Sequence, residues 1–467
     1  MLKTISTKSP SIPTMLKQYL SRGRFVIFLT ILAVMALYVL HHQSCFLSSG
    51  SGTQRPKAFH NLAQDEMMVK SGLHTPAIEQ HIFYGIMFDA GSTGSRIHVF
   101  QFMQDSYDSP IKLMNETFEA IKPGLSYYRQ QPSEGAKSLV PLLDLALTKI
   151  PLAKRKKTPV ALKATAGLRL LPGNQAEVIL NQVHSVIRSY PFRSQNDSVQ
   201  IMDGSDEGIF SWMTVNFLLG SLTGKNKMVA ALDLGGGSTQ ITLVPNDPVT
   251  YEKAPKDFLT NVKLFGTNYR LYTHSYLGLG LMSARFQIMG GKEHATTVEH
   301  DAQTQTLTSN CLPRSYDGTF EHQGIKFPVK RSSRGGGFER CYSSVKKLIT
   351  SRDYSVDKVE ELKTQPVYIF SYYYDRAVES GLIDEGNGGE IHLIDYQTKA
   401  NSICGQPIEK MPYLCMDLVY MYSLLHDGFG LPDNKHLYLK KKIAGVEISW
   451  ALGAMFDMLS VDSGETS

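Results

Sequence analysis

Two stretches of the chain, about 140 residues apart, repeat one pattern. Tyr84–Phe100 reads YGIMFDAGSTGSRIHVF and Met228–Val244 reads MVAALDLGGGSTQITLV. Each has an apolar run, an Asp, a loop of Gly, Ser and Thr, and a second apolar run. This order predicts two β-strands joined by a tight loop. Its duplication predicts two related lobes that face each other across a cleft.

The residues of the two loops suit a bound phosphate. Glycine lets the backbone approach a ligand closely, and exposed N–H groups and hydroxyls can surround an oxyanion. Asp89 and Asp233 end the two first strands, and a carboxylate beside phosphate is repulsive unless a cation lies between them. One loop alone would predict only a turn. The matched pair predicts a phosphate clamp that holds Mg²⁺ or Ca²⁺, partly through water.

Other phosphate-binding and metal-binding patterns do not occur in the sequence. The segment Gly220–Asn226, GSLTGKN, is one residue short of a P-loop and ends in Asn. No dinucleotide-binding glycine pattern follows a strand, kinase signatures are missing, and the 14 histidines show no zinc spacing. Strand-like and helical stretches alternate after residue 81, which predicts an α/β fold with mixed sheets.

The length and charge of the chain bear on its number of domains and on its partners. A chain of 467 residues favours two domains or one two-lobed unit. The formal charge is +5, and five positive charges precede residue 25, where there is no acidic residue. The remainder is close to neutral, so nothing suggests a nucleic-acid partner. We interpret the basic run at residues 154–157 as a solvated loop.

An uncharged apolar segment near the N-terminus predicts attachment to a membrane. Phe25–Leu40 reads FVIFLTILAVMALYVL and would span about 24 Å as a helix at ~1.5 Å per residue. This length favours a signal anchor, with a cleaved signal peptide as the alternative. Basic residues precede the segment, so residues 1–24 are expected to form a cytoplasmic tail. Residues 41–80 are polar and are expected to form a stalk on the luminal or extracellular side.

Sequons and cysteines agree with a luminal or extracellular catalytic part. N-glycosylation sequons begin at Asn115 and Asn196. Besides Cys45, next to the predicted span, the chain has four cysteines, which allow three pairings. The pairing that closes short loops joins Cys311 to Cys341 and Cys404 to Cys415. We expect these two disulfides; the alternative is four free thiols, which an oxidising lumen disfavours.

Two such loops on a duplicated α/β fold resemble the superfamily of actin, sugar kinases and heat-shock ATPases. Further segments resemble the nucleoside triphosphate diphosphohydrolases, also called apyrases, and lie in that family's order: DAGSTGSR (89–96), KATAGLRLL (163–171), DGSDEGIFSWMTVNFLLG (203–220), DLGGGSTQIT (233–242) and KKIAGVEISWALGAMF (441–456). The single N-terminal apolar span, THSYLGLGL and FSYYYDRAVESG are similar to the Golgi and secreted nucleoside diphosphatase branch.

The resemblance implies two ribonuclease-H-like lobes with mixed sheets and an active-site cleft between them. The first lobe would comprise residues 81–205 and the returning segment 440–460. The second lobe would comprise residues 206–439.

The resemblance also implies which residues bind the substrate and the metal. Two sets would hold phosphate: Ser92, Thr93, Gly94 and Ser95 in the first loop, and Gly235, Gly236, Gly237 and Ser238 in the second. Asp89, Asp233 and Thr165 would hold the metal, largely through its water shell. Arg96 would either bind phosphate or form a structural ion pair.

Hydrolysis needs a water molecule in line with the leaving group and a group that activates it. Glu207 stands where the family has its proposed general base. Read alone, it also fits a carboxylate that favours a helix N-terminus. Ser238 and Gln240 would share the water, so no Ser or Cys nucleophile is required. Tyr373 and Tyr374 could stack on a nucleobase, with strand core as an equal alternative.

The branch implies hydrolysis of nucleoside diphosphates, namely GDP, UDP and IDP, with ADP and triphosphates slower. The products would be the monophosphate and phosphate. The place would be the Golgi lumen, for a single-pass type II membrane protein that could also be secreted after cleavage. One alternative is a general nucleoside triphosphate diphosphohydrolase acting on extracellular ATP and ADP. Another is an actin-like, ATP-switched binding protein. The sequence points to no protein partner.

Overall fold

A computed structural model describes residues 81–106, 109–292, 305–314, 316–333, 336–406 and 410–464. These residues belong to one unit, Ile78–Ser467. The tail, apolar span and stalk predicted for residues 1–80 lie outside the described residues. Within the described ranges, no helix combines the length and the apolar character that crossing a membrane requires.

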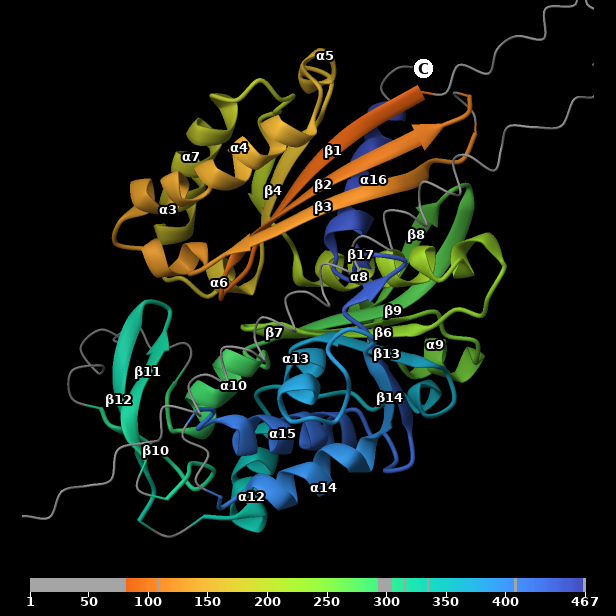
Figure 1. Ribbon diagram of the computed structural model, residues 1–467. Helices are drawn as coiled ribbons and strands as arrows, with labels where there is room; N and C mark the ends of the chain where they lie inside the picture. Colours follow the sequence, from red (N-terminus) through yellow and green to blue (C-terminus); the bar gives the residue numbers. More distant parts are fainter. Residues whose placement is uncertain are drawn as a thin grey trace, which may run out of the picture. The chain divides into compact units, whose positions relative to one another are not determined.

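The first repeated motif forms the centre of a five-stranded mixed sheet (Figure 1). In the order β3-β2-β1-β4-β5 its strands are β3 (Lys112–Ile121), β2 (Ser95–Gln104), β1 (His81–Ala90), β4 (Val160–Ala164) and β5 (Val199–Ile201). The pairs β1–β2 and β2–β3 are antiparallel, whereas β4 and β5 run parallel to β1. The C-terminal part of β1 is buried on both faces, which explains its unbroken apolar run.

The second motif forms the centre of a seven-stranded sheet. In sheet order its strands are β14 (Gly389–His392), β15 (His436–Leu439), β13 (Val367–Ser371), β6 (Ala230–Leu234), β7 (Ser238–Leu243), β9 (Thr267–Leu277) and β8 (Leu259–Leu264). The five strands β9-β7-β6-β13-β15 repeat the directions of β3-β2-β1-β4-β5. The duplicated α/β fold with mixed sheets, expected from the sequence, is therefore confirmed.

Helices cover the outer face of each sheet. Ile86 and Phe88 of β1 belong to a core formed with α3 (Pro132–Ser138), α4 (Val140–Lys149) and α7 (Gln175–Arg188). Leu232 and Leu234 of β6 belong to a core formed with α10 (Leu281–Ile288), α12 (Phe338–Ile349), α13 (Tyr372–Glu379), α14 (Leu393–Ile403) and α15 (Leu414–Ser423). Alternate side chains of each central strand thus face this outer layer.

Smaller elements connect these layers. They are η1 (Leu125–Tyr128), α5 (Leu152–Arg155), α6 (Ala166–Arg169), η2 (Ser221–Thr223), α9 (Pro248–Lys253), η3 (Lys256–Phe258), η4 (Glu360–Lys363) and the π-helical turn η5 (Leu424–Gly428). A three-stranded sheet consists of β10 (Leu307–Ser309), β12 (Ile325–Arg331) and β11 (Asp317–His322), and β16 (Lys442–Ile443) pairs with β17 (Val446–Glu447).

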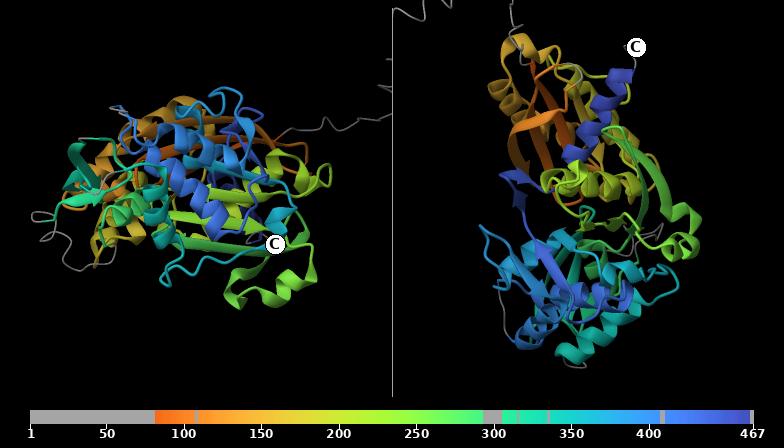
Figure 2. Two further views of the ribbon diagram at one scale, coloured as in Figure 1. Left: turned by 90° about the horizontal axis from the view of Figure 1, so that it is seen from below. Right: turned by 90° about the vertical axis from the view of Figure 1, so that its right-hand side faces the viewer.

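Two helices, α8 (Gly204–Leu218) and α16 (Ala451–Gly464), share a core with both sheets. This core includes Met87 of β1 and Ala231 of β6, and α16 packs against both α8 and β1. In the right-hand view of Figure 2, α16 (dark blue) lies along the orange strands of the first sheet. A Cβ on Gly453 would lie 2.2 Å from the Phe210 carbonyl oxygen, so glycine permits the close contact of α16 with α8.

Apolar residues are buried all around α8. The reason is its position between two sheets and α16. We propose residues 81–205 with 440–460 as the first lobe and 206–439 as the second. The last strand of the first sheet ends at Ile201 and the last strand of the second at Leu439, which supports these boundaries.

Both disulfides of the structure are the pairs expected from the sequence. Cys311 is bonded to Cys341, and Cys404 is bonded to Cys415. The first joins the chain after β10 to α12, and the second joins the end of α14 to the start of α15. They therefore tie together the outer layer of the second lobe.

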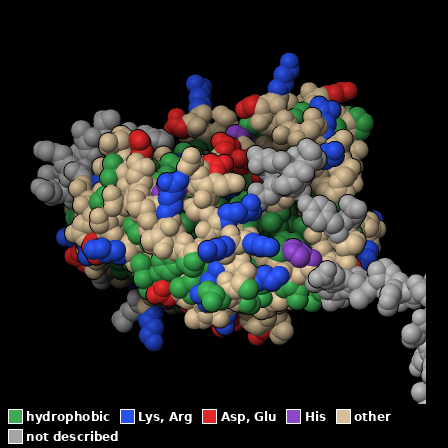
Figure 3. Space-filling view, turned by 90° about the horizontal axis from the view of Figure 1, so that it is seen from above, with side chains coloured by type: hydrophobic (Ala, Val, Ile, Leu, Met, Phe, Trp, Pro, Cys, Tyr) green, Lys and Arg blue, Asp and Glu red, His purple; other side chains and the backbone are tan. Residues whose placement is uncertain are grey.

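The basic run at residues 154–157 was expected to be a solvated loop, but Lys154 and Arg155 end the short helix α5, and only Lys156 and Lys157 follow it as a turn. Arg155 donates from Nε to the Ile150 carbonyl (3.0 Å) and from Nη2 to the Leu147 carbonyl (2.7 Å), while Lys156 and Lys157 are exposed. Figure 3, seen from above, shows Lys and Arg side chains mixed with hydrophobic and acidic ones. The sequon residues Asn115 and Asn196 are also exposed.

Candidate active site

A pocket of about 500 Å³ is lined by residues of both lobes. Both glycine loops line it, together with Asp89, Thr165, Glu207 and Asp233. The other lining residues include charged and aromatic side chains: Arg96, Lys122, Tyr372, Tyr374, Asp375, Arg376, Glu379, Glu385, Lys440, Lys441, Glu447 and Trp450. The pocket thus brings together groups that are far apart in the sequence.

The loop between β1 and β2 presents Gly91, Ser92 and Thr93 to the pocket. Its turn is closed by the Gly91 N–H, which donates to the Gly94 carbonyl (3.0 Å). Gly94 and Ser95 are buried and are not among the lining residues. The expectation that these two residues bind phosphate is corrected, because the turn directs Gly94 towards β3 and Ser95 begins β2.

The loop between β6 and β7 presents all four expected residues: Gly235, Gly236, Gly237 and Ser238. The N–H groups of Met282 and Ser283, in the first turn of α10, donate to the Gly236 carbonyl (2.9 and 3.1 Å) and hold the loop. A Cβ on Gly236 would lie 2.0 Å from Ser92 Oγ. The two loops therefore touch at Gly236, where a larger residue would displace the Ser92 hydroxyl.

Asp89 and Asp233 occupy equivalent positions in the two sheets and are both 6% exposed. In each, Oδ1 is buried and has no hydrogen-bond partner among the described residues. Burial raises the pKa of Asp233 to about 6, and the charge of Asp89 adds to this rise. Unpartnered carboxylate oxygens suit a hard divalent cation.

Thr165 lines the same pocket as these carboxylates, at the N-cap of α6, where its side chain makes no capping hydrogen bond. Within the described ranges, no three His, Cys, Asp or Glu side chains are grouped closely enough to hold a metal. Water or phosphate oxygens would have to complete a coordination shell begun by Asp89 and Asp233.

The residues paired with the two aspartates differ between the lobes. Arg96 faces Asp89 across β1 and β2, and its Nη1 donates to Asp89 Oδ2 (2.8 Å). The charge of Asp89 raises the pKa of Arg96. Of the two roles left open for Arg96, the ion pair is therefore present, and the side chain also lines the pocket.

Gln240 faces Asp233 across β6 and β7. It is 1% exposed and does not line the pocket. Its Nε2 donates to Ser238 Oγ (2.7 Å) and to Ser275 Oγ (2.9 Å). Gln240 is thus connected to the pocket by its hydrogen bond to Ser238, which lines it. The sequence did not identify Ser275, which lies on β9.

Glu207 lies in the first turn of α8, whose N-cap, Asp203, accepts a hydrogen bond from Ser205 N (2.8 Å). It lines the pocket but is only 5% exposed, and its Oε2 accepts a hydrogen bond from Arg169 Nη2. Burial raises the pKa of Glu207 to about 8, although Arg169 opposes the rise. A carboxylate with such a pKa can accept a proton near neutral pH.

The two tyrosines expected to stack on a base have different environments. Tyr373 is fully buried in the core of the second lobe, and its carbonyl accepts a hydrogen bond from Tyr396 Oη (2.8 Å). It does not line the pocket, so its proposed stacking role is corrected in favour of the core alternative. Tyr374 lines the pocket, as does Tyr372, which the sequence analysis passed over. The helical spacing of α13 turns Tyr373 inwards.

Two further residues were missed because their chemistry depends on distant partners. Arg169 belongs to the segment KATAGLRLL, and the sequence indicated no role for it. In the structure it forms a hydrogen bond with Glu207, 38 residues later. Lys441 is the first residue of the segment KKIAGVEISWALGAMF and lines the pocket, as does Glu447. No local pattern in either segment indicates these contacts.

The sequence of the chain is similar to those of a known protein family. Residues 76–466 match the model of the GDA1/CD39 (nucleoside phosphatase) family. The human nucleoside diphosphate phosphatase ENTPD5 is 45% identical over 382 residues, which are 80% of this chain and 87% of that protein. The mouse ectonucleoside triphosphate diphosphohydrolase 6 is 46% identical over 380 residues, or 80% and 81%.

A solved structure shares the fold. It is that of nucleoside triphosphate hydrolases from Neospora caninum, with a TM-score of 0.59 and 15% sequence identity. The match covers 86% of this chain and 97% of that one.

Proposed function

Because the chain belongs to the GDA1/CD39 (nucleoside phosphatase) family, we propose that it hydrolyses nucleoside diphosphates to the monophosphate and phosphate. GDP, UDP and IDP are the proposed main substrates, with ADP and triphosphates hydrolysed more slowly. The observation that carries the proposal is a single pocket that joins two glycine loops, two carboxylates with unpartnered oxygens and the buried Glu207. The name of the human relative supports the diphosphate preference.

The two loops would hold the two phosphates of the substrate. Ser92 and Thr93 offer hydroxyls from the first loop, while Gly235–Gly237 and Ser238 offer N–H groups and a hydroxyl from the second. Because the loops touch at Gly236, neighbouring phosphates of one molecule can reach both. Donors held in place before the reaction stabilise the charge that builds up on the phosphate oxygens.

Glu207 would accept the proton of a water molecule that attacks the terminal phosphorus. The bond from this phosphorus to the bridging oxygen breaks, and the nucleoside monophosphate leaves with that oxygen. Ser238 would orient the water, and Gln240 would hold Ser238 through their 2.7 Å hydrogen bond. Arg169 would favour the ionised form of the Glu207 carboxylate, against the effect of burial, and fix its direction.

Nucleotidases of this family generally use divalent cations, Ca²⁺ or Mg²⁺. We propose that Asp89, Asp233 and Thr165 hold one such ion, largely through water. When bound, the cation would neutralise phosphate charge in the pocket. The buried, unpartnered Oδ1 atoms of both aspartates support this site. Tyr372 and Tyr374 are the proposed aromatic contacts of the base, because both line the pocket.

We propose the secretory pathway, with the Golgi membrane foremost, as the place of the reaction. Phe25–Leu40 would anchor the chain, or a cut after it would release the catalytic part. Two disulfides and the exposed sequon residues Asn115 and Asn196 support an oxidising lumen and a glycoprotein. The proposed partners are the nucleotide and the membrane.

The decisive assay is steady-state phosphate release from GDP, UDP, IDP, ADP, GTP and ATP under one cation concentration. The proposal predicts a higher kcat/KM for GDP and UDP than for ATP. An ATP value that equals the best diphosphate would identify a general nucleoside triphosphate diphosphohydrolase. Binding without continued turnover would identify an ATP-switched binding protein. The Glu207→Gln variant, prepared in the same way, excludes a contaminating phosphatase.

A further inference from the structure

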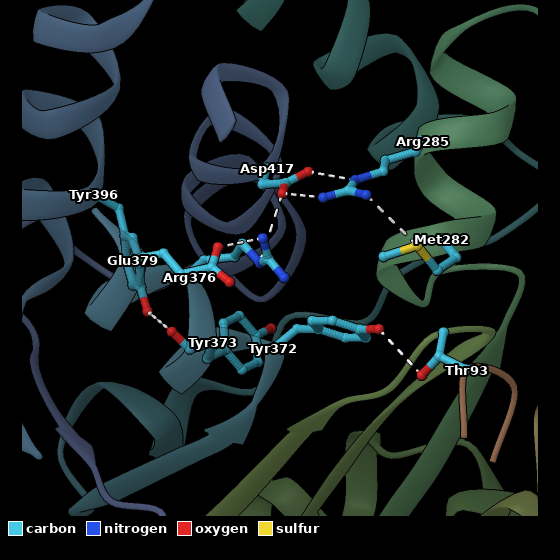
Figure 4. Close-up of polar contacts among 9 residues, drawn as sticks. All are labelled: Thr93, Met282, Arg285, Tyr372, Tyr373, Arg376, Glu379, Tyr396 and Asp417. Carbon is cyan, nitrogen blue, oxygen red and sulfur yellow. Dashed lines mark hydrogen bonds and ion pairs between the residues drawn. The ribbon is translucent and has the colours of Figure 1, made fainter. Parts of the chain in front are cut away.

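Tyr372 connects the second lobe to the phosphate-binding loop of the first. Its Oη donates a hydrogen bond to Thr93 Oγ1 over 3.2 Å (Figure 4). Tyr372 begins α13, which packs on β6 and β13, whereas Thr93 lies in the loop between β1 and β2. Both residues line the pocket. The hydrogen bond therefore joins the two lobes at the site itself.

We infer that Tyr372 is a positioning residue, which orients the Thr93 hydroxyl towards phosphate and holds the lobes closed on a bound diphosphate. This inference rests on the proposed function. A threonine hydroxyl has one proton and two acceptor lone pairs. Since Tyr372 donates to Thr93 Oγ1, the proton of Thr93 is not used in that bond. Thr93 can then donate its own proton to a phosphate oxygen in the pocket.

The Tyr372 ring is held by an ionic cluster of the second lobe. The guanidinium of Arg376, one turn further along α13, lies 5.5 Å from the ring centroid. Arg376 Nη1 donates to Glu379, and its Nε is 3.7 Å from Asp417 Oδ2. Figure 4 shows Arg376 between Glu379 and Asp417, above the tyrosine ring.

Asp417 anchors this cluster in the core. It is fully buried on α15, and its Oδ1 accepts a hydrogen bond from Arg285 Nε of α10 (2.7 Å). Arg285 Nη2 donates to the other carboxylate oxygen, Oδ2. Two guanidinium groups thus converge on one buried carboxylate, and separating any of them from it is costly. Tyr372 is therefore connected, through Arg376, to the buried core of the second lobe.

This anchoring makes the contact sensitive to the separation of the lobes. A hydroxyl–hydroxyl bond of 3.2 Å is already long, and the interaction is largely lost beyond ~3.5 Å. A shift of less than about 1 Å between the lobes would break it. Tyr372 can therefore stabilise only the closed arrangement, in which both loops reach the same substrate.

Tyr374 offers a matched control on the same helix. It also lines the pocket, but its hydroxyl donates to the Glu385 carbonyl of its own lobe. Replacing either tyrosine by phenylalanine keeps the ring and removes one hydroxyl. Only the Tyr372 hydroxyl reaches Thr93. The effect of Tyr372→Phe on KM should therefore depend on the residue at position 93, and the effect of Tyr374→Phe should not.

The test is a double-mutant cycle on the full chain with GDP and Mg²⁺. Tyr372→Phe should raise KM about 3- to 10-fold, the range expected for one hydrogen bond. The value of kcat should change less, because the contact holds bound substrate and transition state alike. In the Thr93→Val background, Tyr372→Phe should have no further effect. Tyr374→Phe should instead have the same effect in both backgrounds. Arg376→Lys should weaken substrate binding in the same direction as Tyr372→Phe.

Equal effects of Tyr372→Phe in the wild-type and Thr93→Val backgrounds would overturn the inference. A change in kcat alone, with KM unaltered in Tyr372→Phe, would also overturn it. Thermal unfolding of each variant shows whether the fold persists. If the wild type hydrolyses no diphosphate, the proposed function fails separately, and the same cycle is then measured as the Kd of a non-hydrolysable methylene analogue of GDP. Coupling between Tyr372 and Thr93 in that Kd would support the positioning role; its absence would refute it.

Discussion

Arg169 donates a hydrogen bond to Glu207, and the two side chains are only 14% and 7% exposed. Arg169 ends α6, the short helix that begins directly after Thr165, while Glu207 lies in the first turn of α8. The contact therefore connects the first sheet to the helix that carries the proposed general base. Burial and the nearby Asp233 and Asp89 favour the neutral form of Glu207, and Arg169 favours the ionised form. The balance between these effects sets the pH range in which Glu207 can act.

This balance predicts a specific dependence on pH. The pKa of Glu207 is raised to about 8, and a base must be deprotonated, so kcat/KM should fall as the pH falls through this region. Arg169→Gln removes a charge that lowers this pKa, so the fall should move to higher pH. The variant should lose activity at pH 7 and regain part of it at about pH 9.

The measurement is a kcat/KM profile of both proteins at fixed free Mg²⁺. Arg352→Gln, an exposed arginine outside the pocket lining, is the control and should leave the profile unchanged. A profile of Arg169→Gln that moves to lower pH would contradict this role of Arg169.

Removal of the divalent cation should abolish turnover. Without it, no cation would separate the phosphates from the carboxylates of Asp89 and Asp233, which line the same pocket. Asp89→Asn and Asp233→Asn should each raise the Mg²⁺ or Ca²⁺ concentration for half-maximal activity by about 10-fold or more, because each weakens a hard-oxygen ligand set. Phosphate release is measured against free cation, with Asp353→Asn, an exposed carboxylate, as the control. Full activity in excess chelator would refute the metal site.

Gly236 should not tolerate even a methyl group. Its Cβ would lie 2.0 Å from Ser92 Oγ and 3.4 Å from the Thr93 side chain. Gly236→Ala should displace the Ser92 hydroxyl from its position in the pocket or push the loops apart, and a displacement of about 1 Å at a reacting site can cost 10²-fold in rate. We expect kcat/KM to fall by about that factor.

The control for this change is Gly386→Ala. The nearest atom to its Cβ would be Asp384 Oδ1, at 3.4 Å, which is ordinary van der Waals contact. Its activity should remain near that of the wild type. Full activity of Gly236→Ala would show that the loops need not touch during turnover.

The duplicated motif was sufficient to predict the fold, because its alternation of apolar strands and glycine loops is local. It also predicted that Asp89 and Asp233 lie at equivalent positions facing one pocket, since each lies one residue before the end of a central strand. The exclusion of Tyr373 from the pocket was not predictable, because three consecutive tyrosines offer no signal for which of them α13 turns away from it.

Contacts between segments far apart in the chain could not be predicted from the sequence either. The pairs Arg169–Glu207 and Tyr372–Thr93 are 38 and 279 residues apart. Gly94 and Ser95 belonged to the right motif, but the turn geometry directs them away from the pocket. A motif gives the composition of a loop, whereas its exposed residues depend on the turn and on the segments packed behind it.

The central claim is that Glu207 activates water in a pocket that binds nucleoside diphosphates, and Glu207→Gln tests it most directly. The substitution keeps the size of the side chain and removes its capacity to accept a proton. Removal of a general base typically costs ~10²–10⁴ in rate, so kcat for GDP should fall by that factor. The Kd for GDP, measured by calorimetry with Mg²⁺, should stay within about threefold. Near-normal kcat in this variant would contradict the account.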